Sequence, residues 1–94
     1  MKSIEIEKIC QAIEPSFWVP GVGGKAIEVF VGFVLTNNLV ETFKARQGEE
    51  DFSLAIEEVC HAVDPRFHVI GVGNRRIGEF VKLANTHNLW EQFK

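Results

Sequence analysis

The chain has 94 residues, of which 46% are hydrophobic and 24% are charged, and its formal net charge at pH 7 is −3. This balance favours one folded domain over a disordered chain, because the apolar content is enough to offset chain entropy. The slightly acidic charge argues against nucleic-acid binding driven by net charge alone, although it permits a local basic patch. The longest apolar stretch, Val29–Leu35, is too short to cross a bilayer, and we expect a cytoplasmic protein without a membrane partner.

The first predicted element is a helix between Ser3 and Pro15. Serine is a good N-cap residue, and proline pushes the residue before it out of the helical region. The apolar residues between them recur with the spacing of one helical face: Ile6, Ile9, Cys10 and Ile13. The sequence therefore predicts an amphipathic helix that begins after Ser3 and is ended by Pro15.

A glycine-rich turn, Gly21-Val22-Gly23, follows the first helix, and two glycines in three residues predict a tight turn with positive φ. A second amphipathic helix comes next, with Ile27, Phe30, Val31 and Val34 on its buried face. Three further apolar residues of this helix need a second surface, either the rest of the chain or a partner: Val29, Phe33 and Leu35.

The third predicted helix carries Leu39 and Phe43. The polar segment before it ends the second helix, and Thr36 or Asn38 can cap the third. Gly48 ends this helix, and acidic residues solvate the segment that follows it.

The whole pattern then repeats, fifty residues further along. Residues 54–94 align with residues 4–44 without a gap, and nearly half of the aligned residues are identical. Ser53 and Pro65 bound the first helix of the second copy, as Ser3 and Pro15 do in the first. We therefore expect an all-α fold in which two tandem three-helix repeats, 4–44 and 54–94, are joined by linker 45–53. They should pack with pseudo-twofold symmetry as a single domain, 1–94. Cys10 and Cys60 lie at matched positions and are predicted to be buried free thiols.

The two glycine-rich turns read "PGVGGKAIE" at 20–28 and "IGVGNRRIG" at 70–78. In both, an apolar residue lies four places after the second glycine and a cation lies two places after it. This pattern resembles the helix-hairpin-helix motif of DNA-binding and repair proteins, whose turns contact the phosphate backbone. On this interpretation the nucleic-acid-binding residues are Gly21, Gly23, Lys25, Gly71, Gly73, Arg75 and Arg76.

A looser resemblance competes with the first. The stretch "DPRFHVIGVGNRRIGEFVKL" is similar to the late part of LOTUS (OST-HTH) domains. Members of that family are winged-helix modules that bind RNA or protein.

Two other interpretations remain open. The turns serve only to connect helices in one of them. In the other, the protein is an interaction or regulatory adaptor, or associates with itself, through Trp18, Phe33 and Trp90. No catalytic, metal or cofactor site is expected. The sequence has no nucleophile elbow and no full-length phosphate loop. A repeated metal or catalytic site is excluded because all three histidines lie in the second copy: His61, His68 and His87. The leading hypothesis is a non-enzymatic module that binds the DNA or RNA backbone through both turns.

Overall fold

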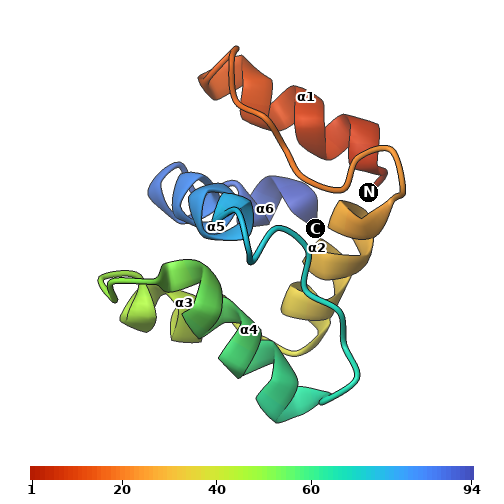
Figure 1. The fold of residues 1–94 in the computed structure, drawn as a ribbon. Coiled ribbons are helices and arrows are strands. Elements are labelled where there is room, and N and C mark those ends of the chain that lie inside the picture. Colours follow the sequence, from red (N-terminus) through yellow and green to blue (C-terminus); the bar gives the residue numbers. More distant parts are fainter.

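The protein, described here by a computed structural model of residues 1–94, is entirely helical, which confirms the all-α part of the predicted fold. Six helices follow one another along the chain, without any strand (Figure 1): α1 (Ser3–Ile13), α2 (Ala26–Thr36), α3 (Val40–Arg46), α4 (Phe52–Val63), α5 (Arg76–Thr86) and α6 (Trp90–Phe93). Helix α1 packs against α2, α4 packs against α5, and α3 contacts both α4 and α5. In the view of Figure 1, α5 and α6 lie between α1 at the top and α3 and α4 below.

One hydrophobic core holds all six helices together. Its buried residues include every apolar position predicted for the inner faces of the second and fifth helices: Ile27, Phe30, Val31, Val34, Ile77, Phe80, Val81 and Ala84. Phe80 lies at the centre of an aromatic cluster, with ring centroids 6.4 Å from Phe30, 6.3 Å from Trp90 and 6.0 Å from Phe93. Residues from both halves of the chain thus share one core.

The helix ends predicted at the two prolines agree with the structure, whereas the helix starts predicted at the two serines do not. Helices α1 and α4 end at Ile13 and Val63, two residues before the prolines, as expected. The prediction that Ser3 and Ser53 are N-caps is wrong, because both lie inside their helices. Asp51 caps α4 instead, with its side chain accepting a hydrogen bond from the N–H of Leu54 at 3.1 Å.

The predicted capping of the third helix by Thr36 or Asn38 is also wrong. Asn38 has a φ of 54°, its N–H donates to Leu35 O at 3.3 Å, and the N–H of Leu39 donates to Val34 O at 3.0 Å. These two bonds and the left-handed residue form a Schellman motif, which closes the end of a helix. Asn88 has the same conformation after α5, with a φ of 53°. The asparagines therefore terminate α2 and α5, and no side chain caps α3 or α6.

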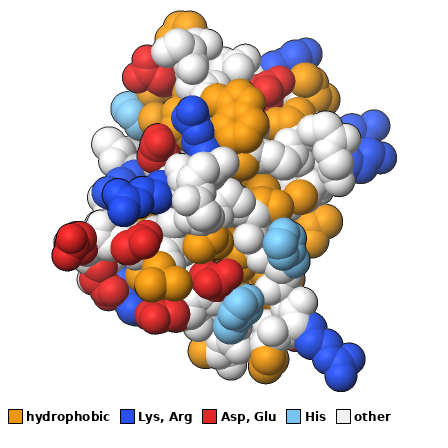
Figure 2. Space-filling model, in the orientation of Figure 1, with side chains coloured by type: hydrophobic (Ala, Val, Ile, Leu, Met, Phe, Trp, Pro, Cys, Tyr) orange, Lys and Arg blue, Asp and Glu red, His pale blue; other side chains and the backbone are white.

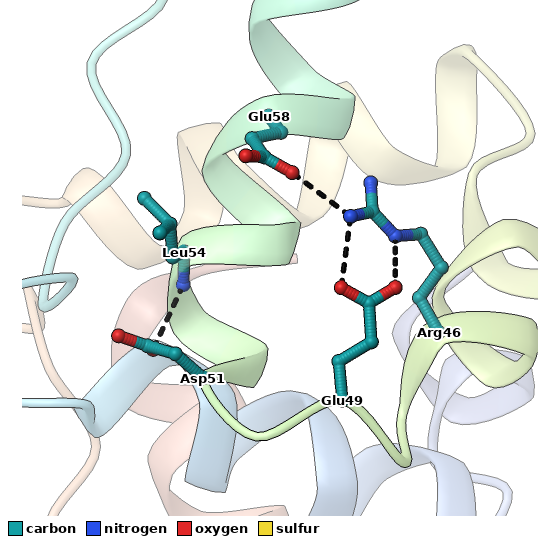
Figure 3. A network of polar contacts seen from close by, with 5 residues as sticks. All are labelled: Arg46, Glu49, Asp51, Leu54 and Glu58. Carbon is teal, nitrogen blue, oxygen red and sulfur yellow. Dashed lines mark hydrogen bonds and ion pairs between the residues drawn. The ribbon is translucent and has the colours of Figure 1, made fainter.

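The segment between α3 and α4 is fixed by charged side chains (Figure 3). Arg46 donates to both carboxylate oxygens of Glu49, at 2.6 and 2.9 Å, and to Glu58 at 2.8 Å. These hydrogen bonds hold the pKa of Glu49 below its ordinary value and raise that of Arg46. The connection itself spans residues 47–51 and is shorter than the linker 45–53 that the sequence indicated.

No single helix has both the length and the apolar character needed to cross a membrane. Helices α2 and α3 reach that length only together, and the chain bends by 97° between them. Their apolar residues Phe30, Val34 and Phe43 belong to the core.

The position of Phe80 gives a direct test of the core. The substitution Phe80→Ala should lower the free energy of unfolding by roughly 3–5 kcal/mol, because it leaves a cavity among aromatic rings. Val29, on α2 and 59% exposed, supplies the control. Val29→Ala should change stability by no more than about 0.5 kcal/mol. Urea unfolding of both variants gives the comparison, and equal midpoints would show that Phe80 is not central to the core.

The two cysteines are free and buried, as the sequence predicted. Burial raises the pKa of the Cys60 thiol from 9.0 to about 12. Burial, with a smaller contribution from the charge of Glu7, raises that of Cys10 to the same value. The fold therefore holds both groups as neutral thiols throughout the physiological range.

This burial predicts a loss of stability in alkali. Above pH 9 the thiols ionise in the unfolded chain while they stay protonated in the fold, so the unfolded state binds fewer protons. The contribution of the buried thiols to the free energy of unfolding is complete below pH 9 and should disappear as the pH rises to about 12. Urea unfolding from pH 8 upward should show a steeper decline for the native protein than for Cys10→Ala with Cys60→Ala. Parallel declines would contradict the burial of the thiols.

Candidate nucleic-acid interface

The predicted phosphate-binding turns lie on the two longest connections of the fold, residues 14–25 and 64–75. Each connection begins in the extended conformation that proline imposes on the residue before it, with φ values of −134° at Glu14 and −143° at Asp64. A side chain from the preceding helix then holds the carbonyl of a phenylalanine. Gln11 Nε2 donates to Phe17 O at 3.2 Å, and His61 Nε2 lies 2.9 Å from Phe67 O.

The first glycine of each turn has the positive φ that the sequence predicted, 73° at Gly21 and 69° at Gly71. The N–H of Ile27 donates to Gly21 O at 3.1 Å, and that of Ile77 donates to Gly71 O at 3.3 Å. The second glycine of each turn does not have positive φ. Each turn therefore closes onto the start of the following helix through its first glycine.

A feature that sequence reasoning missed is the backbone of the two cations. Lys25 and Arg75 both have a φ of 62°, in the left-handed region, directly before α2 and α5. Residues with a Cβ rarely adopt this conformation, which costs roughly 1–2 kcal/mol. Both side chains are exposed, and neither forms an ion pair or a hydrogen bond within the protein. Each turn therefore holds an unpaired cation at a strained position.

Arg76 is engaged with the opposite half of the chain. Its guanidinium lies 5.0 Å from the centre of the Trp18 ring, and its Nη1 lies 3.9 Å from a carboxylate oxygen of Glu79. Trp18 remains 51% exposed beside it. Figure 2 shows hydrophobic side chains at the surface between α1 and α5, with basic side chains nearby. Arg76 is thus less free than Lys25 or Arg75 to bind a ligand.

The two connections touch each other. A Cβ added to Gly21 would lie 2.5 Å from Cδ1 of Ile70, the residue before the second turn. In Figure 1 the connections, orange and teal, cross the same side of the molecule. The fold therefore brings together two turns that are fifty residues apart in sequence.

The turns differ in their free backbone donors. The N–H groups of Gly23, Gly24 and Ala26 donate no hydrogen bond within the protein. In the second turn the N–H groups of Gly73 and Asn74 are likewise unpaired, and the difference is the N–H of Arg76, matched to Ala26, which donates to Asn74 Oδ1 at 3.1 Å. Since unpaired N–H groups at a helix start attract anions, the first turn is the more open of the two.

The residues of the alternative partner surface do not form one exposed patch. The ring of Phe33 stacks on Phe67 with centroids 4.0 Å apart, so the second half of the chain covers it. Trp90 is only 2% exposed, and its Nε1 donates to Asn85 Oδ1 at 2.8 Å. Trp90 is therefore part of the core rather than an exposed anchor, and Trp18 is the member of this set that remains available.

Comparison of the sequence with models of known protein families finds no match, and neither the curated proteins nor the solved structures contain one. The function is therefore argued from the side chains and backbone of this chain.

The first turn supplies a matched pair of glycine substitutions. Gly21→Ala should lower the free energy of unfolding by roughly 1–3 kcal/mol, because its φ is positive and the new Cβ would meet Ile70 and Ala26. Gly23→Ala should be nearly neutral, since nothing lies within 4 Å of a Cβ there. Thermal melts of the two variants test this geometry. A Gly23→Ala variant as unstable as Gly21→Ala would contradict the conformation of the turn.

Proposed function

We propose that the chain is a small, non-enzymatic nucleic-acid-binding module that contacts the phosphate backbone through both glycine-rich turns. The observation that carries the proposal is the pair of unpaired, exposed cations at strained backbone positions, Lys25 and Arg75. Glycine or asparagine would adopt the left-handed conformation at lower cost. A strained backbone at two matched surface positions, each carrying a positive charge, favours a binding role over a purely connecting one.

Further support comes from the surroundings of these cations. Gly23, Gly24 and Gly73 are exposed, and nothing lies within 4 Å of where their Cβ atoms would be, so a ligand can approach the backbone closely. The free N–H groups of the first turn and the start of an eleven-residue helix favour an anion. Contacts of this kind go to phosphates rather than to base edges, so binding should depend little on sequence.

We also propose that the chain is one domain of two tandem repeats packed with pseudo-twofold symmetry. Helices α2 and α5 begin and end at positions fifty apart, and the φ values at Lys25 and Asn38 match those at Arg75 and Asn88 within 1°. On this proposal the two turns are related by the symmetry axis, and each contacts one strand of a nucleic acid. The likeness to helix-hairpin-helix motifs supports the same assignment.

Salt dependence and paired variants test the proposal. With about four phosphates contacted, the logarithm of the association constant should fall with the logarithm of salt concentration with a slope of about −3 to −4. Replacing both cations, Lys25→Gly with Arg75→Gly, should abolish binding to duplex and single-stranded oligonucleotides in fluorescence anisotropy. The same double variant should be at least as stable as the native protein, because glycine relieves the left-handed strain.

A matched control separates the turns from net charge. Lys8→Ala with Lys44→Ala removes the same two positive charges from α1 and α3, away from both turns. This variant should keep most of the affinity. Equal weakening by the two double variants would show that the turns are not the binding site, and absence of binding at low salt would overturn the proposal.

The exposure of Trp18 favours one alternative, a protein-interaction or regulatory adaptor. A large aromatic side chain that is half exposed and covered on one side by Arg76 is typical of an interface anchor. Self-association through this surface would be seen as a dimer mass in solution. Trp18→Ala would return that mass to the monomer without changing binding to nucleic acid.

A further inference from the structure

Helix α1 crosses α2 beside the first turn, and α4 crosses α5 beside the second. The two crossings differ in one pair of matched residues. Where α4 crosses α5, the N–H of Gly78 donates to Oγ of Ser53 at 2.9 Å. A Cβ added to Gly78 would lie 2.6 Å from that oxygen and 3.1 Å from the N of Ser53. This close approach of the two helices therefore depends on glycine at position 78.

The matched pair in the first half, Ser3 and Glu28, cannot form the same contact. Glu28 has a side chain where Gly78 has none, and its N–H donates no hydrogen bond in the structure. The hydroxyl of Ser3 is buried and has no partner, although Ser3 is only 5% exposed. A buried hydroxyl without a partner costs about 1–3 kcal/mol. The first crossing thus leaves unsatisfied two polar groups that bond to each other in the second.

A pocket lies between these groups and the first turn. It has a volume of about 420 Å³, and its lining includes Lys2, Ser3, Gly23, Lys25 and Glu28. The pocket beside the second crossing is smaller, about 220 Å³. Its lining holds two cations, as the first pocket does, but three acidic residues against one: Arg75 and Lys82 with Glu50, Asp51 and Glu79. The N–H of Arg76 beside it is already paired with Asn74 Oδ1. The features that favour an anion are therefore concentrated in the first half.

We propose that the pocket beside the first turn binds a phosphate monoester. Lys2 and Lys25 offer two positive charges to a group that carries nearly two negative charges at pH 7. Of the residues with free donors, Gly23 and Ser3 line the pocket: the N–H of Gly23 supplies one hydrogen-bond donor to the phosphate oxygens, and the partnerless hydroxyl of Ser3 supplies a second by rotating toward the pocket. The carboxylate of Glu28 also lines the pocket and offsets part of this positive charge.

A free nucleotide and the terminal phosphate of a strand offer this same chemistry. If the phosphate belongs to the end of a nucleic-acid strand, this inference rests on the proposed function. The phosphate pocket involves the first turn alone, whereas the proposed function needs both turns.

The test is a titration of the ¹⁵N-labelled protein with adenosine 5′-monophosphate, with adenosine as the control that lacks the phosphate. The amides of Gly23, Gly24 and Ala26 should shift with the monophosphate and not with adenosine, while those of Gly73 and Asn74 stay in place. Affinity should fall as the pH drops below about 6, where the phosphate takes up its second proton. Oligonucleotides with and without a 5′-phosphate then distinguish a strand end from a free nucleotide.

Matched substitutions make the assignment specific. Lys25→Gln should weaken binding about tenfold or more, because it removes a charged donor, and Arg75→Gln should leave it unchanged. Ser3→Ala should weaken binding severalfold. Glu28→Gly should let α1 approach α2 and close the pocket, whereas Glu28→Ala, which keeps a Cβ, should leave the phosphate site open.

The possible outcomes separate this inference from the proposed function. No amide shift in the first turn, equal shifts with adenosine, or equal effects of Lys25→Gln and Arg75→Gln would overturn the pocket. Severalfold weaker monophosphate binding in Ser3→Ala would support it. Oligonucleotide binding that needs both turns without monophosphate binding would overturn the pocket and leave the proposed function standing. Monophosphate binding without any binding to oligonucleotides that lack a terminal phosphate would support the pocket and overturn the proposed function.

Discussion

The edge-to-face contact between Phe30 and Phe80 joins the two halves of the chain. The rings belong to α2 and α5, their centroids are 6.4 Å apart, and both side chains are almost completely buried. Phe43 stacks on Phe30 and Phe93 stacks on Phe80, so the short helices α3 and α6 join the same cluster. Burial of these large rings provides much of the driving force for a chain of this size. Because α2 and α5 are fixed in this way, the turns that precede them are held on a rigid base.

The strain at the turns has its physical origin in how these helices start. A hydrogen bond from the first turn of α2 back to Gly21 closes the connection tightly, and the residue directly before the helix must then adopt positive φ. That residue is Lys25 in the first half and Arg75 in the second. The core packing of Ile27 and Ile77, both completely buried, prevents the helix start from relaxing. In each half a strained cation thus stands two residues before a completely buried core isoleucine.

Small differences between the halves have large local consequences. Gly78 lets α4 and α5 approach until Ser53 bonds to the backbone, while in the first half Glu28 stands at the matched position and Ser3 has no partner. Asn74 caps α5 with its side chain, where Gly24 leaves the start of α2 open. The hydroxyl of Ser3 and the N–H groups of Ala26 and Glu28 are left without partners in the first half, whereas the matched groups of the second half are paired. The two turns therefore differ in their polar surroundings even though their backbones are closely alike.

The sequence by itself determined the helical class, the inner faces of α2 and α5, the prolines that end α1 and α4, and the positive φ of Gly21 and Gly71. These features follow from local sterics and from the 3.6-residue period of apolar residues. The serine caps and the capping of the third helix were predicted wrongly where several polar residues compete for one helix end, and the expected exposure of Trp90 was wrong because tertiary packing buries it. The gapless repeat matches Ser3 with Ser53 and Glu28 with Gly78, but the sequence alone did not show that Ser53 and Gly78 meet where α4 crosses α5.

Only the tertiary structure decided that Trp90 is buried while Trp18 is exposed, that Phe33 is covered by Phe67, and that Ile70 contacts Gly21. These outcomes depend on contacts between residues far apart in the chain, which no local pattern specifies. The left-handed conformation of Lys25 and Arg75 belongs with them, because tertiary packing overrides the intrinsic preference of both residues.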